Sequence, residues 1–78
     1  MRVKKEQLVI SFASTAHAMA VEAFCMEREL PGRLIPIPKE ISAGCGLAWK
    51  ANPEDEQVLL DAFKKEDISY QGVHKVVI

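Results

Sequence analysis

Apolar and polar positions along the chain change their spacing several times, and the first half divides accordingly into a strand and a helix. Gln7–Ala13 is an apolar run that is too short for a helix and rich in β-forming residues, which predicts a buried strand. Ala16–Leu30 is dominated by Ala, Met, Glu and Leu and contains neither Gly nor Pro, which predicts a helix. Ser14 and Thr15 precede it as natural N-cap residues.

The residues after this helix predict two strands with a loop between them. The Pro-Gly pair at 31–32 ends the helix and turns the chain. Arg33–Ile37 is expected to be a short edge strand or the end of one, because Pro36 and Pro38 have no backbone N–H to donate to a strand ladder. Lys39–Gly46 is glycine-containing and is expected to be a loop, and Leu47–Ala51 is expected to be the next strand.

The last third of the chain predicts a second helix and a final strand. Asn52 followed by Pro and two acidic residues is a typical helix start. An apolar stripe at helical spacing is expected to be core, with the members Val58, Leu59, Ala62 and Phe63. In the first helix, whose apolar residues run almost all the way round, we expect Ala20 and Phe24 in the core and Met19 and Met26 in helix packing. Ser69–Ile78 contains the final strand.

The element order β-α-β-β-α-β predicts one domain over residues 1–78, with the α+β class and a ferredoxin-like sandwich. In this fold both helices cover one face of a four-stranded antiparallel sheet. Right-handed crossovers place the first and third strands in the centre and the second strand at an edge, where its prolines are tolerated. Because a 78-residue domain is only modestly stable, two copies are expected to associate through an exposed sheet edge.

Composition and charge narrow the classes of function. The chain has ten Lys and Arg residues and eleven Asp and Glu residues, and the sequence contains no basic stripe. We therefore expect no nucleic-acid binding. No apolar segment is long enough to span a membrane or to act as a secretory signal, which predicts a cytoplasmic protein. The two cysteines lack metal-site and dithiol spacing, so we expect free thiols and no metal or other cofactor.

Topology gives one of these cysteines a distinctive place. The loop that holds Cys45 closes at the same end of the sheet as the N-terminus of the first helix, whose free N–H groups run from about Thr15 to His17. A thiolate at such a helix end is stabilised. The neighbouring Gly44 and Gly46 leave the sulfur uncrowded. The remaining candidates at the site are the nearest cations, Lys39 and His17, and three hydroxyl residues, Ser14, Thr15 and Ser42.

Each candidate also has a plainer interpretation. A lone cysteine such as Cys45 is more often a small residue that fills a tight turn. Cys25 lies among apolar helix residues and is expected to be packed and inert. A first-turn His17 is more often solvated or capping than catalytic, and His74 is expected to be a surface residue.

Nearly the whole chain resembles the selenium/sulfur carrier protein-like family of small bacterial domains. The resemblance rests on Ser14-Thr15 before the helix, on the Pro-Gly-Arg-Leu-Ile-Pro stretch at 31–36, on Pro-Lys-Glu-Ile-Ser at 38–42, and on Cys-Gly-Leu at 45–47. It implies a carrier role in which Cys45 accepts sulfur or selenium as a persulfide or perselenide from a donor enzyme and presents it to an acceptor protein. A carrier needs no turnover chemistry, so the resemblance implies that the chain is not an enzyme.

Two other functions stay open from the sequence. A small-ligand-binding or regulatory interaction module would leave Cys45 dispensable and would depend on a pocket or a dimer face. A thiol-dependent enzyme would need a base and an orienting partner beside Cys45. His17 is the only base that the sequence offers there.

Overall fold

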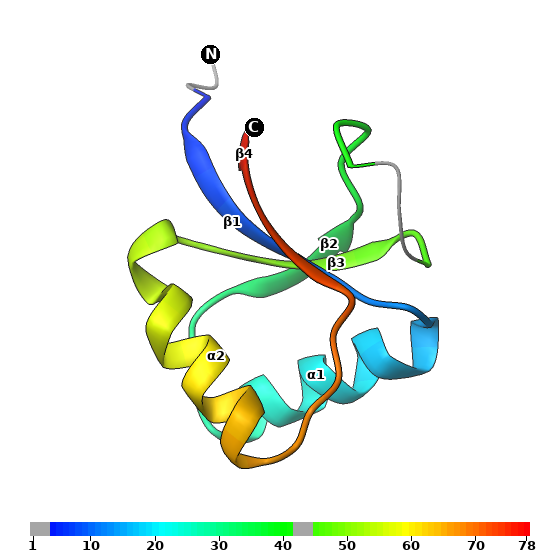
Figure 1. Cartoon of the computed structure of the whole chain (residues 1–78), viewed down its shortest axis with the longest axis vertical. Coiled ribbons are helices and arrows are strands. Elements are labelled where there is room, and N and C mark those ends of the chain that lie inside the picture. The colour runs from blue at the N-terminus through cyan, green and yellow to red at the C-terminus, as the bar shows by residue number, and fades with distance from the viewer. Residues whose placement is uncertain (1–3, 42–44) are drawn as a thin grey trace.

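The computed structural model describes residues 4–41 and 45–78 as a two-layer α+β domain. Its strands are β1 (Glu6–Ser11), β2 (Arg33–Pro36), β3 (Leu47–Ala51) and β4 (Gly72–Val77). Its helices are α1 (Thr15–Glu27), the short 3₁₀ helix η1 (Pro53–Asp55) and α2 (Glu56–Lys65). The strands form one antiparallel sheet in the order β2-β3-β1-β4, and both α-helices lie on the same face of it (Figure 1). The predicted α+β class and the four-stranded antiparallel sheet with β1 and β3 in the centre are confirmed.

The edge position of β2 is confirmed as well. This strand pairs with β3 alone, and Pro36, opposite Leu47, is its last residue. A proline at that place costs no ladder bond, because the outer side of β2 has no partner strand among the described residues. The other edge is β4, and association of two copies through an edge stays a prediction.

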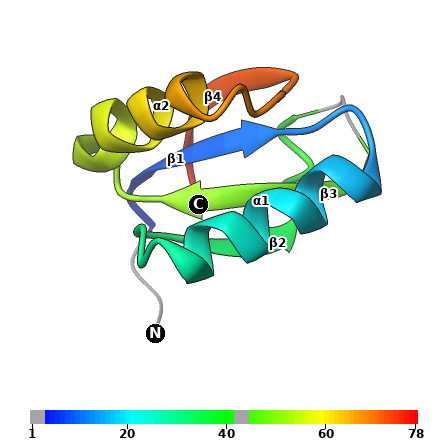
Figure 2. The ribbon, with the colours of Figure 1, turned by 90° about the horizontal axis from the view of Figure 1, so that it is seen from below.

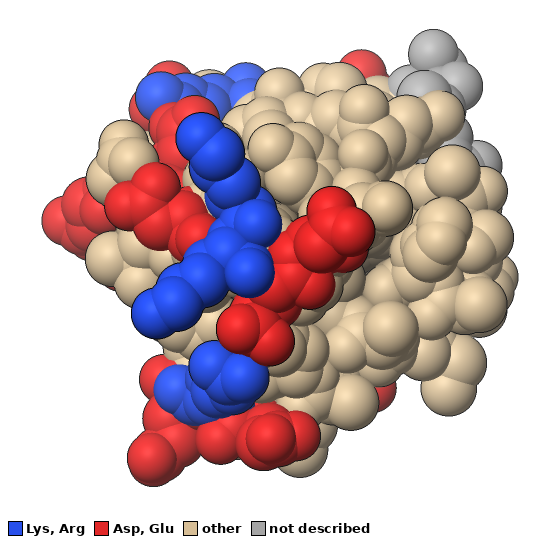
Figure 3. Space-filling model, turned by 60° about the horizontal axis from the view of Figure 1, so that its bottom comes forward, with Lys and Arg blue, Asp and Glu red and all other residues tan. Residues whose placement is uncertain are grey.

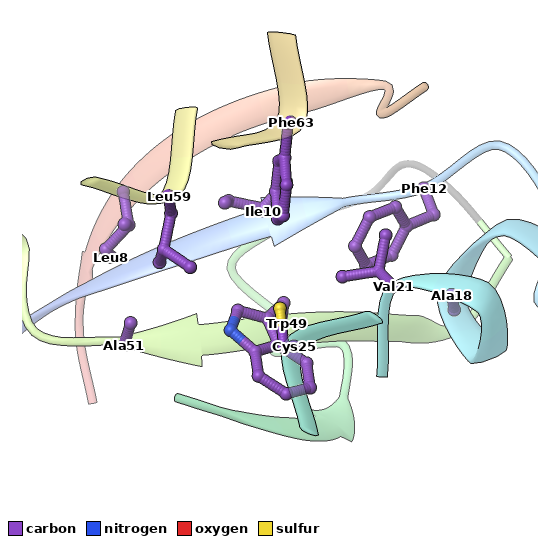
Figure 4. Packing of buried hydrophobic residues seen from close by; sticks show 10 residues of the cluster. All are labelled: Leu8, Ile10, Phe12, Ala18, Val21, Cys25, Trp49, Ala51, Leu59 and Phe63. Atoms are coloured by element: carbon purple, nitrogen blue, oxygen red, sulfur yellow. The ribbon is translucent and has the colours of Figure 1, made fainter. Parts of the chain in front are cut away.

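The main core lies between the helices and the sheet (Figure 4). The alternate residues Leu8, Ile10 and Phe12 point from β1 and its end into this layer and are fully buried. Helix α1 crosses β3 and β2, whereas α2 lies on the side of β1 and β4 (Figure 2). Trp49 on β3 is a buried member of this core. Its indole N–H donates a 3.0 Å hydrogen bond to the carbonyl oxygen of Pro31.

Helix α2 corrects part of the predicted apolar stripe. Leu59 and Phe63, four residues apart, are fully buried as expected, but Val58 is 52% exposed and Ala62 is only half-buried. Neighbouring helix residues are rotated by about 100° from each other. A narrow stripe through Leu59 and Phe63 therefore turns Val58 towards solvent.

Helix α1 buries a different face from the one predicted. Its buried residues are Ala18, Val21 and Cys25, while Ala20 is exposed. Phe24 is half-buried and packs against the core cluster, as predicted. The prediction that Met19 and Met26 pack was also wrong, since these side chains are 58% and 71% exposed. An apolar pattern that runs round the whole helix gives no preferred face, so contact with β3 decides which residues are buried.

Both helices end in the same left-handed turn. Helix α1 stops at Glu27 rather than at the predicted Leu30, and Glu29 has a φ of 53°. The N–H of Leu30 then donates to the carbonyl of Cys25 at 2.8 Å, which is the Schellman pattern. Asp67, with a φ of 56°, ends α2 in the same way. Sequence reasoning missed the first stop because glycine, the usual signal, is absent there.

The second sheet face carries a smaller apolar cluster. Val9 and Ala48 are fully buried on it, together with Ile41, which is 8% exposed. The segment 37–41 rises above this face (Figure 1), and Ile37 contributes to the same cluster. We call this side, opposite the helices, the open face.

Candidate functional site

Cys45 lies where β1 ends and α1 begins. Its backbone N–H donates to the carbonyl oxygen of Phe12 at 3.1 Å. Phe12 itself is fully buried, and the half-buried Cys45 side chain packs against the same core cluster. The predicted convergence of the cysteine loop and the start of α1 is therefore present, and it is fixed through the residue that follows β1.

Gly46 gives this loop its backbone conformation. Its φ is 95°, a value that L-residues with a side chain rarely adopt. Its carbonyl accepts a 2.9 Å hydrogen bond from the N–H of Ile37, which extends the β2–β3 pairing by one residue. Apart from its two chain neighbours, no described residue lies within 4 Å of where a Cβ at this glycine would be. The glycine is thus required for its φ and not by crowding from the described residues.

The two thiols differ sharply in environment. Cys25 is fully buried between α1 and the sheet (Figure 4), and loss of solvation raises the pKa of its thiol from 9.0 to about 11. It is therefore protonated and enclosed at neutral pH. Cys45 is partly exposed, and its Sγ lies 3.9 Å from the carbonyl oxygen of Leu47, a weak contact for an S–H donor. Cys45 is the thiol that a reagent can reach.

The start of α1 has a well-formed cap. Ser14 is the N-cap, and its Oγ accepts from the N–H of His17 at 3.2 Å. The helix begins at Thr15, one residue earlier than predicted. His17 is exposed, and this hydrogen bond uses its backbone rather than its ring.

The structure does not join every predicted site residue to the thiol. Lys39 is exposed on the segment that leads into the loop. No hydrogen bond between described residues connects Lys39 or the His17 ring to the Sγ of Cys45. Ser42 and Gly44, which were also predicted to belong to the site, lie outside the described residues.

Sequence reasoning missed the charge distribution around Cys45. The three longest segments without Lys, Arg, Asp or Glu are residues 7–21, 41–49 and 68–74. Backbone hydrogen bonds bring them together, because Cys45 bonds to Phe12 and the N–H of Gln71 donates to the carbonyl of Ser11 at 2.7 Å. Figure 3 shows charged side chains gathered on one side of the helix-bearing surface and a broad uncharged area on the other. We call the end of the domain at Cys45 the uncharged end.

A serine–histidine contact on the open face was also missed. Ser11 is fully buried, and its Oγ lies 3.2 Å from Nε2 of His74, which is half-buried rather than a surface residue. The signal was the Gly-x-His spacing in β4: alternate strand residues share a face, and a Cβ at Gly72 would lie 3.0 Å from that nitrogen. Cys45 packs into the core on the other side of the sheet, so this pair is not in its site.

Residues 4–41 and 45–78 hold no cluster of three His, Cys, Asp or Glu side chains arranged for a metal ion. Within the same ranges, neither helix has the length and apolar character needed to cross a membrane.

One comparison with known proteins identifies the family of the chain. No curated protein and no solved structure matches the chain. A family described as "Putative Se/S carrier protein-like" matches residues 7–75, which include Cys45, the Phe12 carbonyl that anchors it and the whole of α1. This match covers most of the sequence, and the chain therefore belongs to the Se/S carrier protein-like family.

Proposed function

We propose that the protein is a sulfur or selenium carrier whose acceptor group is the thiol of Cys45. The observation that carries the proposal is the contrast between the two thiols. Cys45 is reachable and lies on a loop anchored to β1, whereas Cys25 is buried with a raised pKa. Membership of the family supports a carrier role.

The transfer step needs only the thiolate and a donor persulfide. The Cys45 thiolate attacks the terminal sulfur of the donor's persulfide, a new S–S bond forms, and the donor's own S–S bond breaks to release its thiolate. Cys45 then holds –S–SH, with no net oxidation and no cofactor. A perselenide donor would give –S–SeH by the same displacement, and attack by an acceptor thiolate on the terminal atom would reverse the step.

The surroundings of Cys45 suit a transfer between proteins. The half-buried Cys45 has a glycine on its C-terminal side, so no side chain at position 46 limits access to the sulfur. The uncharged end offers donor and acceptor proteins a surface without fixed charges, and burial of such surface favours association. Met19, in the charge-free segment 7–21, is 58% exposed. The proposal places the protein in the reducing cytoplasm, where free thiols persist, and assigns it no turnover of its own.

The test is intact-mass analysis after incubation with a cysteine desulfurase and cysteine, without reductant. We expect the wild-type chain and Cys25→Ser to gain the mass of one sulfur atom, and Cys45→Ser to gain none. Dithiothreitol should remove the added mass, because it reduces a persulfide. Uptake by Cys45→Ser, or none by the wild type with an active donor, would contradict the carrier function.

A binding module is the second candidate, and one observation favours it. Two adjoining hollows on the open face are lined by Lys5, Arg33 and Lys50, and Cys45 lines neither of them. A thiol-dependent enzyme has less support, since no described hydrogen bond places an imidazole beside the Cys45 sulfur.

A further inference from the structure

Three cations converge on the open face at the end of the sheet away from Cys45. Arg33 on β2 and Lys50 on β3 are directly opposite each other, and Lys5 lies just before β1. Like charges in directly opposite positions of neighbouring strands repel each other. None of the three forms an ion pair with a described carboxylate, although Arg28 and Lys75 elsewhere do. The fold therefore keeps a local excess of positive charge on this face.

The cations surround two adjoining hollows. Both hollows are lined by Lys5, Gln7, Arg33 and Lys50. The larger has a volume of about 380 Å³ and an apolar wall formed by Ile35, Pro36 and Ile78, and no Asp or Glu side chain lines it. The smaller, of about 340 Å³, reaches to Asn52 and Asp55. These volumes lie in the range of small-molecule sites, about 300–1,000 Å³.

Gln7 adds a hydrogen-bonding group to the lining of the hollows. The residue is only 6% exposed, yet no hydrogen bond joins its side chain to another described residue. Every described side-chain N or O atom that is fully buried has a partner. The amide of Gln7 must therefore be accessible from the hollows that it lines. A nearly buried amide with no protein partner, beside three cations, is a donor available to an anion.

We propose that these hollows bind a phosphate-type oxyanion of a small soluble molecule. Arg33 offers the planar fork that suits two phosphate oxygens, the two lysines add point charges, and Gln7 adds an amide donor. The rest of the ligand lies against the apolar wall of Ile35, Pro36 and Ile78. The inference does not depend on the carrier function, because neither Cys45 nor Phe12 lines either hollow.

The test uses inorganic phosphate and AMP as probes, at constant ionic strength set with sodium chloride. Amide chemical shifts of the ¹⁵N-labelled protein are followed during each titration. We expect saturable shifts at Lys5, Gln7, Arg33 and Lys50, with tighter binding of AMP than of phosphate. Arg33→Gln and Lys50→Gln should each weaken AMP binding by about tenfold, since each removes a charge-assisted contact.

Lys64→Gln/Lys65→Gln is the matched control, because it removes two positive charges from α2 and should leave AMP affinity unchanged. The melting temperature of unliganded Arg33→Gln should be equal to or above that of the wild type, since the change relieves repulsion from Lys50. Equal weakening by control and site variants, or shifts reproduced by chloride alone, would overturn the proposal. So would binding to vesicles that contain phosphatidic acid when neither soluble probe binds.

Discussion

The backbone N–H of Cys45 donates a 3.1 Å hydrogen bond to the carbonyl oxygen of Phe12, which ties the thiol loop to a fully buried residue. Because Phe12 directly follows β1, this bond sets the position of the sulfur relative to both the sheet and the start of α1. Cys45 is held at the boundary between core and solvent. Cys25 has no such access, although both residues contribute to the same core cluster.

This arrangement predicts that native Cys45 is alkylated by iodoacetamide long before Cys25. Cys25 can react only in molecules that are locally or globally unfolded. Its reaction is therefore slower by about a thousandfold or more in a domain of ordinary stability. Mass spectrometry of digested samples taken over time measures both rates. Cys45→Ser and Cys25→Ala isolate each thiol, and denaturant should bring the two rates together. Equal rates in the native protein would contradict the assigned burial.

Two glycines with positive φ should respond differently to alanine. Gly46 and Gly32 have φ values of 95° and 111°, so either substitution strains the backbone, by about 1–2 kcal/mol. A Cβ at Gly32 would also clash with the Trp49 indole and lie 2.6 Å from the carbonyl oxygen of Lys50, whereas a Cβ at Gly46 would meet nothing. Urea denaturation should show a larger loss for Gly32→Ala than for Gly46→Ala. A larger loss of stability for Gly46→Ala than for Gly32→Ala would show that the contacts of the new Cβ do not determine the destabilisation.

Helix α2 offers a matched pair of core and surface substitutions. Phe63→Ala should lower the free energy of unfolding by about 3–5 kcal/mol, because it opens a cavity beneath the helix. Val58→Ala should change it by no more than about 0.5 kcal/mol, since that side chain is 52% exposed. Thermal and chemical denaturation of both variants measure the difference. If Val58→Ala lowered the free energy of unfolding as much as Phe63→Ala, Val58 would be a core residue, as expected from the sequence.

The predictions that succeeded are those that depend on chain order and local chemistry. Pro36 excluded a central strand for β2, and the element order placed β1 and β3 in the centre of the sheet. The buried face of α1 could not be predicted, because apolar residues lie all round the helix. Packing against β3 determines which of them are buried. The hollow between Arg33 and Lys50 depends on strand register, which sequence spacing alone does not give.

The left-handed residues that end the helices predict an increase in stability. Glu29→Gly and Asp67→Gly should each raise the free energy of unfolding by about 0.5–1 kcal/mol, because glycine adopts a positive φ without steric cost. Glu27→Gly is the control and should lower it by about 1 kcal/mol, since Glu27 is the last residue with helical geometry. Chemical denaturation compares the three. If Glu29→Gly lowered the free energy of unfolding as much as Glu27→Gly, the backbone at residue 29 would not be strained.

Burial of Cys25 makes stability depend on alkaline pH. The pKa of its thiol is about 11 in the folded protein, against 9.0 for an unburied thiol. Below pH 9 the thiol is protonated in both states, so its contribution to stability is fully present. As pH rises from 9 towards 11, the unfolded state loses the proton first, and this contribution is lost.

The free energy of unfolding should therefore fall more steeply with pH in Cys45→Ser than in Cys45→Ser/Cys25→Ala, a comparison in which Cys25 is the only remaining thiol. The difference between the two curves should reach no more than about 3 kcal/mol, the limit set by a shift of about two pH units. Urea denaturation at successive pH values across this interval measures both curves, and titration of lysines and tyrosine cancels in the comparison. Parallel curves would mean that the Cys25 thiol ionises as readily in the folded chain as in the unfolded one.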